Sequence, residues 1–295
     1  MNLSINALSK TYANGVHALK DVTLSLSNGM FGLLGPNGAG KSSLMRTIAT
    51  LQEADEGTIS LDNLDVLKNK TEVRQLLGYL PQEFGVYPKV SAERMLGHIA
   101  RLKGIENAGE RKELVGSLLE NVNLSKDRKK HLGTFSGGMK QRFGIAQALI
   151  GSPKLIIVDE PTAGLDPAER NRFYNLLSQL GEDTIVILST HIVEDVSTLC
   201  SNFAIICQGE VLYAGQPDTA VTAMEGKIFS KAIDKDKLSY YQGQFKVIST
   251  QLKTGKLHIR ILHDGDPANG FVPAIPNLED VYFSNVATRV DVNTI

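Results

Sequence analysis

The chain of 295 residues has little cysteine, almost no net charge and no long apolar run, and each absence excludes a class of protein. Its two cysteines, Cys200 and Cys207, lie in or beside apolar segments, which favours reduced core thiols over a disulfide framework or a metal site. A formal net charge of -1 provides no basic field, so we expect no nucleic-acid partner. The local basic cluster at 126–131 is typical of a solvated loop.

No uninterrupted apolar stretch approaches the length of about 20 residues that a membrane-spanning helix requires. The runs Leu155–Val158 and Ile185–Leu188 are far too short, so any membrane channel must be provided by another chain. Residues 1–6 lack a basic segment followed by an apolar one, and we therefore expect no export signal. With 42% hydrophobic residues the chain can form a sizeable core, as one large or two moderate domains.

The most informative stretch that is present, 35–42, fits the phosphate-binding loop pattern G-x-x-x-x-G-K-[ST]. An apolar run at 30–34 predicts a strand before it, and 43–49 predicts a helix after it, as the motif requires. Its glycines allow tight turns that point backbone N–H groups at a triphosphate, at a helix N-terminus whose dipole favours negative charge. The expected nucleotide-binding residues are Gly35, Pro36, Asn37, Gly38, Ala39, Gly40, Lys41, Ser42 and Ser43.

A second apolar run, 155–158, predicts a strand buried on both faces of a parallel sheet, and it ends in Asp159 and Glu160. Lys41 can reach the β- and γ-phosphates, and Ser42 can place its hydroxyl on the magnesium that bridges them. Asp159 suits a magnesium ligand, directly or through water, while Glu160 suits the base that accepts a proton from the attacking water. A solvated strand-end pair is the alternative, which Lys41 and Ser42 disfavour.

The segment 134–142 predicts a second anion site at the start of a helix. Ser136 is typical of a helix N-cap, and Gly137 and Gly138 expose the first N–H groups of the helix that follows. Here the chain resembles the ATP-binding subunits of ABC transporters, whose signature is L-S-G-G-Q or a close variant. This sequence has Phe and Met at the first and last of these positions, and it retains the Ser-Gly-Gly centre that touches phosphate in the family.

The resemblance implies roles for four further residues in the expected order. Tyr12 resembles the aromatic residue on which adenine stacks, although a tyrosine near a turn is by itself more often structural. Gln82 matches the glutamine that contacts the metal and begins the loop facing the membrane partner, although a lone glutamine is usually a surface residue. Asp166, in Gly164-Leu165-Asp166, matches the loop that crosses to the opposite subunit. His191 matches the histidine that contacts the γ-phosphate, after an apolar strand.

The resemblance implies an α/β fold of the P-loop NTPase class over residues 1–220, the ABC ATPase domain. Alternating apolar and polar residues predict an antiparallel β layer at 2–30, ahead of the phosphate-binding loop. Apolar residues at helical spacing predict a helical insert at about 88–148. Further core strands are expected at 184–188 and 203–207.

The C-terminal residues, 221–295, predict a small α+β accessory domain without a catalytic constellation. Three segments, 228–233, 245–249 and 257–262, have the pattern of strands, and a helix is expected to open at 276. The stretch 278–283 resembles the closing helix of ABC subunits that pair with separate permeases in export.

The motifs together imply an ATPase that uses ATP and Mg²⁺ and works as a pair of subunits stacked head to tail. Lys41 of one subunit and Ser136–Gly138 of the other would then enclose one ATP, in a homodimer or with a different ATPase subunit. The resemblance implies transport, with export favoured over import, through a separate integral-membrane permease. The protein would then be cytoplasmic and peripheral on the inner face of the cell membrane.

Two other functions remain open on the sequence. A soluble ABC-type ATPase acting on a cytoplasmic assembly is disfavoured, because the chain has one ATPase unit, no coiled-coil insert and no basic field. A non-hydrolysing, ATP-regulated interaction module is disfavoured by the presence of Glu160 and His191. The transported substrate cannot be deduced from this chain, because the permease would select it.

Overall fold

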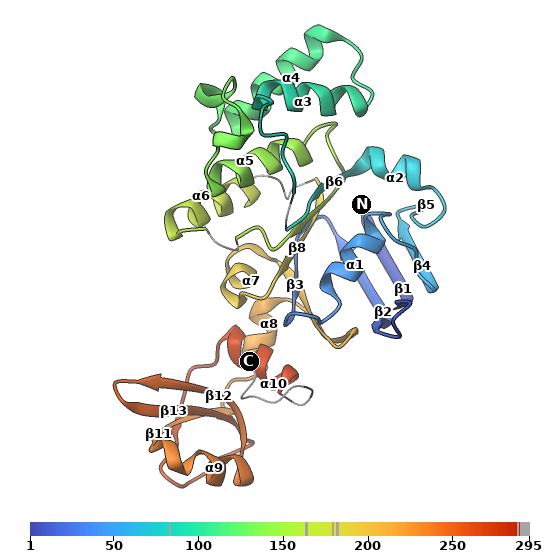
Figure 1. The fold of residues 1–295 in the computed structure, drawn as a ribbon. Coiled ribbons are helices and arrows are strands. Elements are labelled where there is room, and N and C mark those ends of the chain that lie inside the picture. Colours follow the sequence, from blue (N-terminus) through green and yellow to red (C-terminus); the bar gives the residue numbers. More distant parts are fainter. Residues whose placement is uncertain (83, 163–164, 179, 181–182, 288, 290–295) are drawn as a thin grey trace.

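The structure is a computed structural model of the chain, and it describes residues 1–82, 84–162, 165–178, 180, 183–287 and 289. These residues form two four-stranded sheets and one six-stranded sheet. Figure 1 shows a helical lobe at one end of the molecule, two sheets in the middle and the third sheet at the other end.

The first sheet is the antiparallel layer that the sequence predicts ahead of the phosphate-binding loop. Its strand order is β2-β1-β4-β5. Alternate residues of β1 are buried, with Leu3 opposite Leu26 of β2, so one face of the sheet packs inward. The strands are β1 (Asn2–Thr11), β2 (His17–Ser27), β4 (Glu56–Leu61) and β5 (Leu64–Asp65).

The six-stranded sheet, in the order β10-β9-β3-β8-β7-β6, is the central layer. All pairings except β9 with β10 are parallel, so the carboxyl ends of β3, β7 and β8 meet at one edge. Every residue of β7 and β8 is buried, which explains why both strands are continuously apolar up to the polar residues at their carboxyl ends. The strands are β3 (Gly29–Leu34), β6 (Leu77–Leu80), β7 (Leu155–Asp159), β8 (Ile185–Thr190), β9 (Asn202–Cys207) and β10 (Glu210–Gly215).

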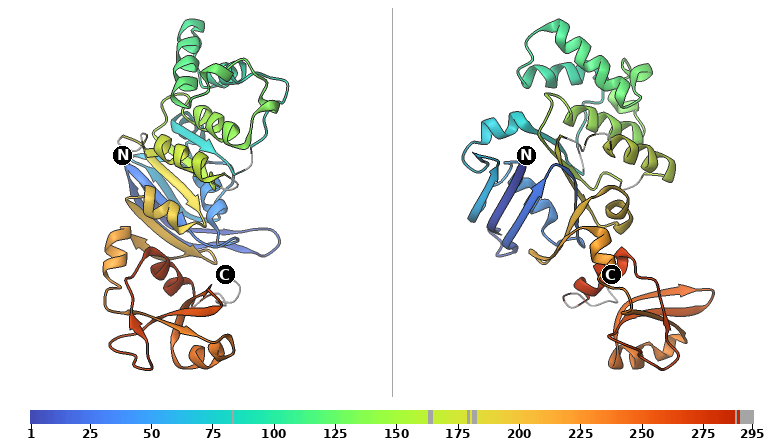
Figure 2. Two further views of the ribbon diagram at one scale, coloured as in Figure 1. Left: turned by 90° about the vertical axis from the view of Figure 1, so that its left-hand side faces the viewer. Right: turned by 180° about the vertical axis from the view of Figure 1, so that it is seen from behind.

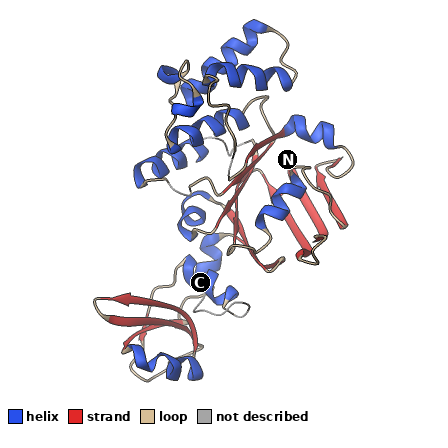
Figure 3. Ribbon diagram, in the orientation of Figure 1, coloured by secondary structure: helices blue, strands red, loops and turns tan. Residues whose placement is uncertain are grey.

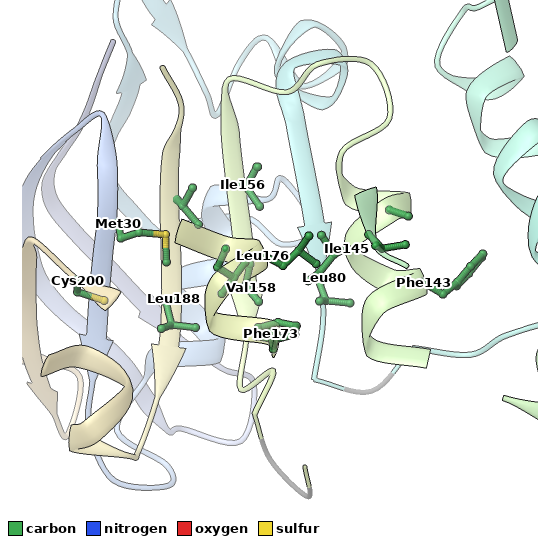
Figure 4. Close-up of a cluster of buried hydrophobic side chains, with 14 of the residues drawn as sticks. Met30, Leu80, Phe143, Ile145, Ile156, Val158, Phe173, Leu176, Leu188 and Cys200 are labelled. Carbon is green, nitrogen blue, oxygen red and sulfur yellow. The ribbon is translucent and has the colours of Figure 1, made fainter. Parts of the chain in front are cut away.

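Helices pack on both sides of the central sheet, and α3, α4 and α5 form the helical insert that the sequence predicts at about 88–148. In Figure 4, Phe143 of α5 and Phe173 of α6 lie in the same apolar cluster as Val158 of β7. Figure 3 shows helices gathered at the lobe end and strands in the middle, which confirms the α/β fold class. The helices are α1 (Lys41–Ile48), α2 (Lys70–Leu76), α3 (Ala92–Leu102), α4 (Ala108–Asn121), α5 (Gly137–Ala148), α6 (Pro167–Ser178) and α7 (Val193–Leu199).

The third sheet, in the order β12-β13-β11-β14, is antiparallel and has a small core of its own. Its core is rich in aromatic side chains, among them Tyr241 of α9 and Phe271. Its elements are β11 (Ile228–Ile233), α9 (Leu238–Gln244), β12 (Lys246–Lys253), β13 (Lys256–Leu262) and β14 (Val272–Pro273), after α8 (Pro217–Thr222).

The last helix, α10 (Leu278–Val286), follows the third sheet in the chain, but it packs against residues 1–220, the main domain. Leu278, Val281, Tyr282 and Val286 are buried in the same apolar cluster as α5, α6 and α7. Figures 1 and 2 show α10 at the junction between the third sheet and the rest of the molecule. The division into residues 1–220 and 221–295 stays a prediction, and α10 bridges the two parts.

Within the described ranges, no helix combines the length and the apolar character needed to cross a bilayer. Cys200 and Cys207 are both buried and not disulfide-bonded. Burial raises the pKa of the Cys200 thiol to about 12.

Candidate nucleotide-binding site

The loop between β3 and α1 has a backbone that tight packing on neighbouring strands holds in place. Gly40 has φ of 107°, and a Cβ there would lie 2.4 Å from the carbonyl oxygen of Ala18. At Gly35 a Cβ would lie 2.2 Å from the carbonyl oxygen of Ile206. No side chain caps the start of α1, so its first N–H groups are available to an anion.

Lys41 begins α1 and lies almost completely inside the loop, with 4% of the residue exposed. Its Nζ donates to the carbonyl oxygens of Gly35 at 2.6 Å and Pro36 at 3.1 Å, and lies 3.7 Å from Oε1 of Glu160. Burial lowers the pKa of Lys41, while the carboxylates of Glu160 and Asp159 act in the opposite direction. The loop thus holds a buried positive charge beside the place where phosphates would lie.

Glu160, directly after β7, is the point at which four of the predicted residues meet. Its Oε2 accepts from Nε2 of Gln82 at 3.2 Å and lies 3.4 Å from Nδ1 of His191. Its backbone has φ of 46°, a left-handed conformation that is uncommon outside glycine and that is concentrated at functional sites. The side chain of Glu160 is 11% exposed, so a water molecule could still reach its carboxylate.

Asp159, the last residue of β7, is 5% exposed and keeps one polar atom unsatisfied. Among the described residues, its Oδ1 has no hydrogen-bond partner, and neither has the hydroxyl of the neighbouring Ser189. Burial and then the charge of Glu160 raise the pKa of Asp159, whereas the hydroxyls of Ser189 and Ser42 and the charge of Lys41 lower it. A buried carboxylate beside the hydroxyl of Ser42 fits the oxygen ligands that Mg²⁺ prefers.

A cavity of about 840 Å³ opens over the loop, and its walls come from five separate parts of the chain. Tyr12 forms one wall, where its hydroxyl lies 2.9 Å from Oγ of Ser43 and donates to Oε1 of Gln52 at 3.0 Å. Sequence reasoning missed His17, the first residue of β2, and Gln208, in the turn after β9, which also line the cavity, because neither belongs to a motif. The remaining lining residues include Val16, Ala18, Lys20, Asn37, Gly38, Ala39, Gly40, Lys41, Ser42, Gln82 and Glu160.

The predicted signature segment lies at the start of α5. Oγ of Ser136 accepts from the N–H of Met139 at 3.2 Å, as expected of an N-cap. Gly138 leaves room for Glu169 of α6, since a Cβ there would lie 2.6 Å from Oε2 of that residue. Ser136, Gly137 and Gly138 do not line the cavity over the phosphate-binding loop.

Asp166, predicted to face the opposite subunit, is exposed just before α6. Its Oδ1 accepts from the N–H of Glu169 at 2.8 Å. Gly164 of the same predicted loop lies outside the described residues. One chain therefore carries two separate groups of predicted nucleotide contacts, and only the first, around Lys41, lines the cavity.

Comparison with known proteins places this arrangement in a family. The family model described as "ABC transporter" matches residues 19–163. The chain is 36% identical over 237 residues to the uncharacterized ABC transporter ATP-binding protein YxlF of Bacillus subtilis, covering 80% of this chain and 78% of that protein. It is 40% identical over 199 residues to the linearmycin resistance ATP-binding protein LnrL of the same organism, covering 67% of this chain and 64% of LnrL.

A solved structure matches the same part of the chain. It is the dimeric post-hydrolysis state of the ATP-binding cassette MJ0796 bound to ADP and Pi, which superposes with a TM-score of 0.67 at 26% identity. The match covers 72% of this chain and 98% of that one.

Proposed function

This chain belongs to the ABC transporter family of ATP-binding proteins, and we propose that it hydrolyses ATP to drive transport through a separate membrane permease. The observation that carries the proposal is the convergence of Lys41, Gln82 and His191 on Glu160, beside a phosphate-binding loop. These are the groups that phosphoryl transfer to water needs, and they come from four separate parts of the sequence.

ATP would bind with its phosphates in the loop 35–43 and its adenine ring against Tyr12. The backbone N–H groups of the loop and the Nζ of Lys41 would donate to the phosphate oxygens. Because Lys41 already donates to loop carbonyls, binding requires only that its Nζ exchange those partners for phosphate. The hydrogen bonds of the Tyr12 hydroxyl to Ser43 and Gln52 hold its ring at the wall of the cavity.

Mg²⁺ would be held by Ser42, Gln82 and Asp159, which offer a hydroxyl, an amide oxygen and a carboxylate. The ion, when bound, supplies positive charge against the β- and γ-phosphate oxygens. The unsatisfied Oδ1 of Asp159 supports this assignment, because a buried carboxylate oxygen is costly unless a partner completes it.

Glu160 would act as the general base. Its carboxylate takes the proton of the attacking water as the water oxygen bonds to the γ-phosphorus, and the bond from that phosphorus to the β–γ bridging oxygen breaks. The products are ADP and inorganic phosphate. His191, 3.4 Å from the same carboxylate, would orient it and contact the γ-phosphate.

A second ATPase subunit would complete the site. Ser136, Gly137, Gly138 and Asp166 do not line the cavity over Lys41, so these residues would serve the nucleotide of a partner subunit stacked head to tail. The dimeric form of the cassette MJ0796, to which this chain is similar, supports such an arrangement. Either a homodimer or a pair with a different ATPase subunit satisfies it.

Export is the direction of transport that we propose. The support is the name of LnrL, a linearmycin resistance protein, together with the sequence of α10. The match spans 64% of LnrL, and the substrate would be chosen by the permease rather than by this chain. Through that permease the protein would lie on the cytoplasmic face of the membrane.

The variant Glu160→Gln tests the catalytic part of the proposal. It keeps size and hydrogen bonding but cannot accept the proton, so we expect turnover to fall by about 10²–10⁴-fold while ATP still binds. The ATP-bound pair would form without being discharged, and the variant should accumulate as an ATP-dependent dimer in size-exclusion chromatography.

The matched control is Glu225→Gln, an exposed carboxylate shortly after α8, for which turnover should stay at the wild-type value. Wild-type turnover in Glu160→Gln would remove Glu160 from the mechanism. Loss of turnover without dimer accumulation would instead contradict the head-to-tail pair.

A further inference from the structure

Asp195 is a completely buried carboxylate behind the proposed site, on α7, and no part of the proposed reaction uses it. It accepts three hydrogen bonds from side-chain hydroxyls on three other segments. Tyr174 of α6 donates to Oδ1, while Thr162 and Thr190 donate to Oδ2 at 2.8 Å and 2.7 Å. One carboxylate therefore joins α6, α7, the segment after β7 and the last residue of β8.

The two threonines that share Oδ2 are neighbours of the two residues that face each other in the site. Thr162 follows Glu160 by two residues, and Thr190 directly precedes His191. The hydroxyl of Thr190 also accepts from the N–H of Ile192 at 2.9 Å, so its contacts fix the backbone on both sides of His191.

Both carboxylate oxygens of Asp195 have hydrogen-bond partners. A buried carboxylate costs free energy unless its oxygens are hydrogen-bonded, and here three hydroxyls satisfy them. Burial and the bond to Asp195 raise the pKa of the Tyr174 hydroxyl, which keeps it a donor. None of Asp195, Thr162 and Thr190 lines the nucleotide cavity.

We propose that Asp195 is a positioning residue for hydrolysis, which sets the separation between Glu160 and His191 by holding Thr162 and Thr190 on one carboxylate oxygen. The inference rests on the proposed function of Glu160. The strand ends themselves stay joined, because the N–H of Glu160 donates to the carbonyl oxygen of Ser189 at 3.0 Å. If the shared acceptor is lost, Thr162 and Thr190 are no longer held to one oxygen, and the side chains of Glu160 and His191, whose Oε2 and Nδ1 lie 3.4 Å apart, can separate.

The phosphate-binding loop keeps contacts outside this network, such as the hydrogen bond from the N–H of Gly209 to the carbonyl oxygen of Ala39 at 2.9 Å. Its backbone bond to Thr190, from the N–H of Gly35 at 3.4 Å, does not involve the threonine hydroxyl.

The experiment compares two buried aspartates, Asp195→Asn and Asp280→Asn, in the full chain. In Asp195→Asn an amide group replaces one acceptor oxygen, and we expect kcat to fall by about 10–100-fold, since a displacement near 1 Å can cost about 10²-fold. We expect the Kd for ATP, measured by calorimetry, to stay within about twofold, because Lys41 and the backbone N–H groups of the loop, which supply most of the proposed phosphate contacts, are untouched.

Asp280→Asn is the matched control for the general effect of disturbing a buried carboxylate. Asp280 is 1% exposed, accepts from Nε and Nη2 of Arg260 and from the N–H of Asn277, and does not line the nucleotide cavity. It should lower the unfolding temperature and leave kcat unchanged. An equal loss of kcat in both variants would overturn the proposal, because kcat would then follow stability alone.

A second pair of variants decides the matter if Asp195→Asn fails to fold. Thr190→Val keeps the shape of the side chain and removes its hydroxyl, whereas Thr190→Ser retains the donor. We expect kcat to fall in Thr190→Val and to recover in Thr190→Ser, at unchanged Kd for ATP. Equal kcat in these two variants would overturn the proposal.

Glu160→Gln, measured alongside, separates this inference from the proposed function. Wild-type turnover in Glu160→Gln would refute the role of Glu160 and with it both proposals. Loss of turnover there, with wild-type kcat in Asp195→Asn, would refute only the role of Asp195.

Discussion

The main domain and the third sheet differ in how completely their buried side-chain polar atoms are hydrogen-bonded. In the described part of the chain, the buried side-chain polar atoms without a hydrogen-bond partner all lie within residues 1–220. Two of them, on Asp159 and Ser189, lie at the end of β7 and β8, where the nucleotide site is proposed. The others belong to Asn28, Gln141, Arg142 and Arg170. Since an unsatisfied buried group is costly, the pair on Asp159 and Ser189 supports the end of β7 and β8 as the place that a ligand completes.

The third sheet and α10, by contrast, complete their own polar groups. Nζ of Lys231 donates to the hydroxyl of Tyr241 at 2.7 Å and lies 4.9 Å from the centroid of that ring. Asp280 pairs with Arg260 and closes the capping box of α10 with Asn277. Because these polar groups find their partners within residues 221–295, they need no ligand. We therefore expect the C-terminal part to affect stability more than catalysis.

The largest expected effect is the loss of stability on removing α10, which we expect to exceed the loss on removing the third sheet. A chain truncated at 221 loses α10 and exposes the apolar surface that the four buried apolar side chains of this helix cover. The loss in free energy of unfolding is about 1.5–3 kcal/mol for each of the four side chains. We expect this truncation to aggregate.

Excision of the third sheet alone is the matched experiment. The chain enters and leaves it at one place, where the N–H of Ala274 donates to the carbonyl oxygen of Ile228 at 2.9 Å. Replacing residues 228–273 by a short Gly-Ser linker should keep a folded, unaggregated chain with ATPase activity, as measured by gel filtration and phosphate release. Loss of nucleotide binding in that folded variant would contradict the comparison.

The next effect compares two lysines. Lys41→Ala removes the one charged donor from a loop of neutral N–H groups, and we expect the affinity for ATP to fall by about 100-fold or more. Lys231→Ala disturbs the third sheet and should lower the unfolding temperature at unchanged affinity. Calorimetric titration with ATP measures both, and near-normal affinity in Lys41→Ala would place the site elsewhere.

A smaller effect, of opposite sign in the two regions, is expected from replacing a buried aspartate by asparagine. Burial raises the pKa of Asp159, so the folded state disfavours its charge, and Asp159→Asn should keep or increase thermal stability in the absence of Mg²⁺. Its ATPase activity should require a higher concentration of Mg²⁺. Asp280→Asn should instead lower the free energy of unfolding by about 1–3 kcal/mol, because Arg260 loses its partner. Thermal melts that shift in the same direction would refute the contrast.

The smallest effect concerns the wall of the cavity. Tyr12→Ala removes the ring on which adenine is expected to stack, and a loss of about 1–3 kcal/mol in ATP binding should follow. Tyr12→Phe keeps the ring and gives up only the hydrogen bonds to Ser43 and Gln52, so its affinity should stay close to that of the wild type. Equal affinities in the two variants would show that the ring does not contact the base.

The sequence predicted those parts of the fold that depend on local patterns. The alternation at 2–30, the apolar run before Asp159 and the cap at Ser136 each act over a few residues, and the structure has β1, β2, β7 and α5 in those places. The helix at the C-terminus was also predicted from local pattern. Its packing against the main domain was not, because nothing in a helical pattern states which surface covers it.

By itself the sequence determined which residues could bind phosphate, since the glycines, Lys41 and Ser42 of the loop follow one another along the chain. Only the tertiary structure decided that Glu160 meets Gln82 and His191, residues 78 and 31 positions away in sequence. It also decided that Asp195, which follows another acidic residue, Glu194, is buried and accepts hydrogen bonds from three hydroxyls. The physical reason is that parallel strands bring distant segments to a common edge, and the contacts made there depend on packing between elements rather than on local sequence.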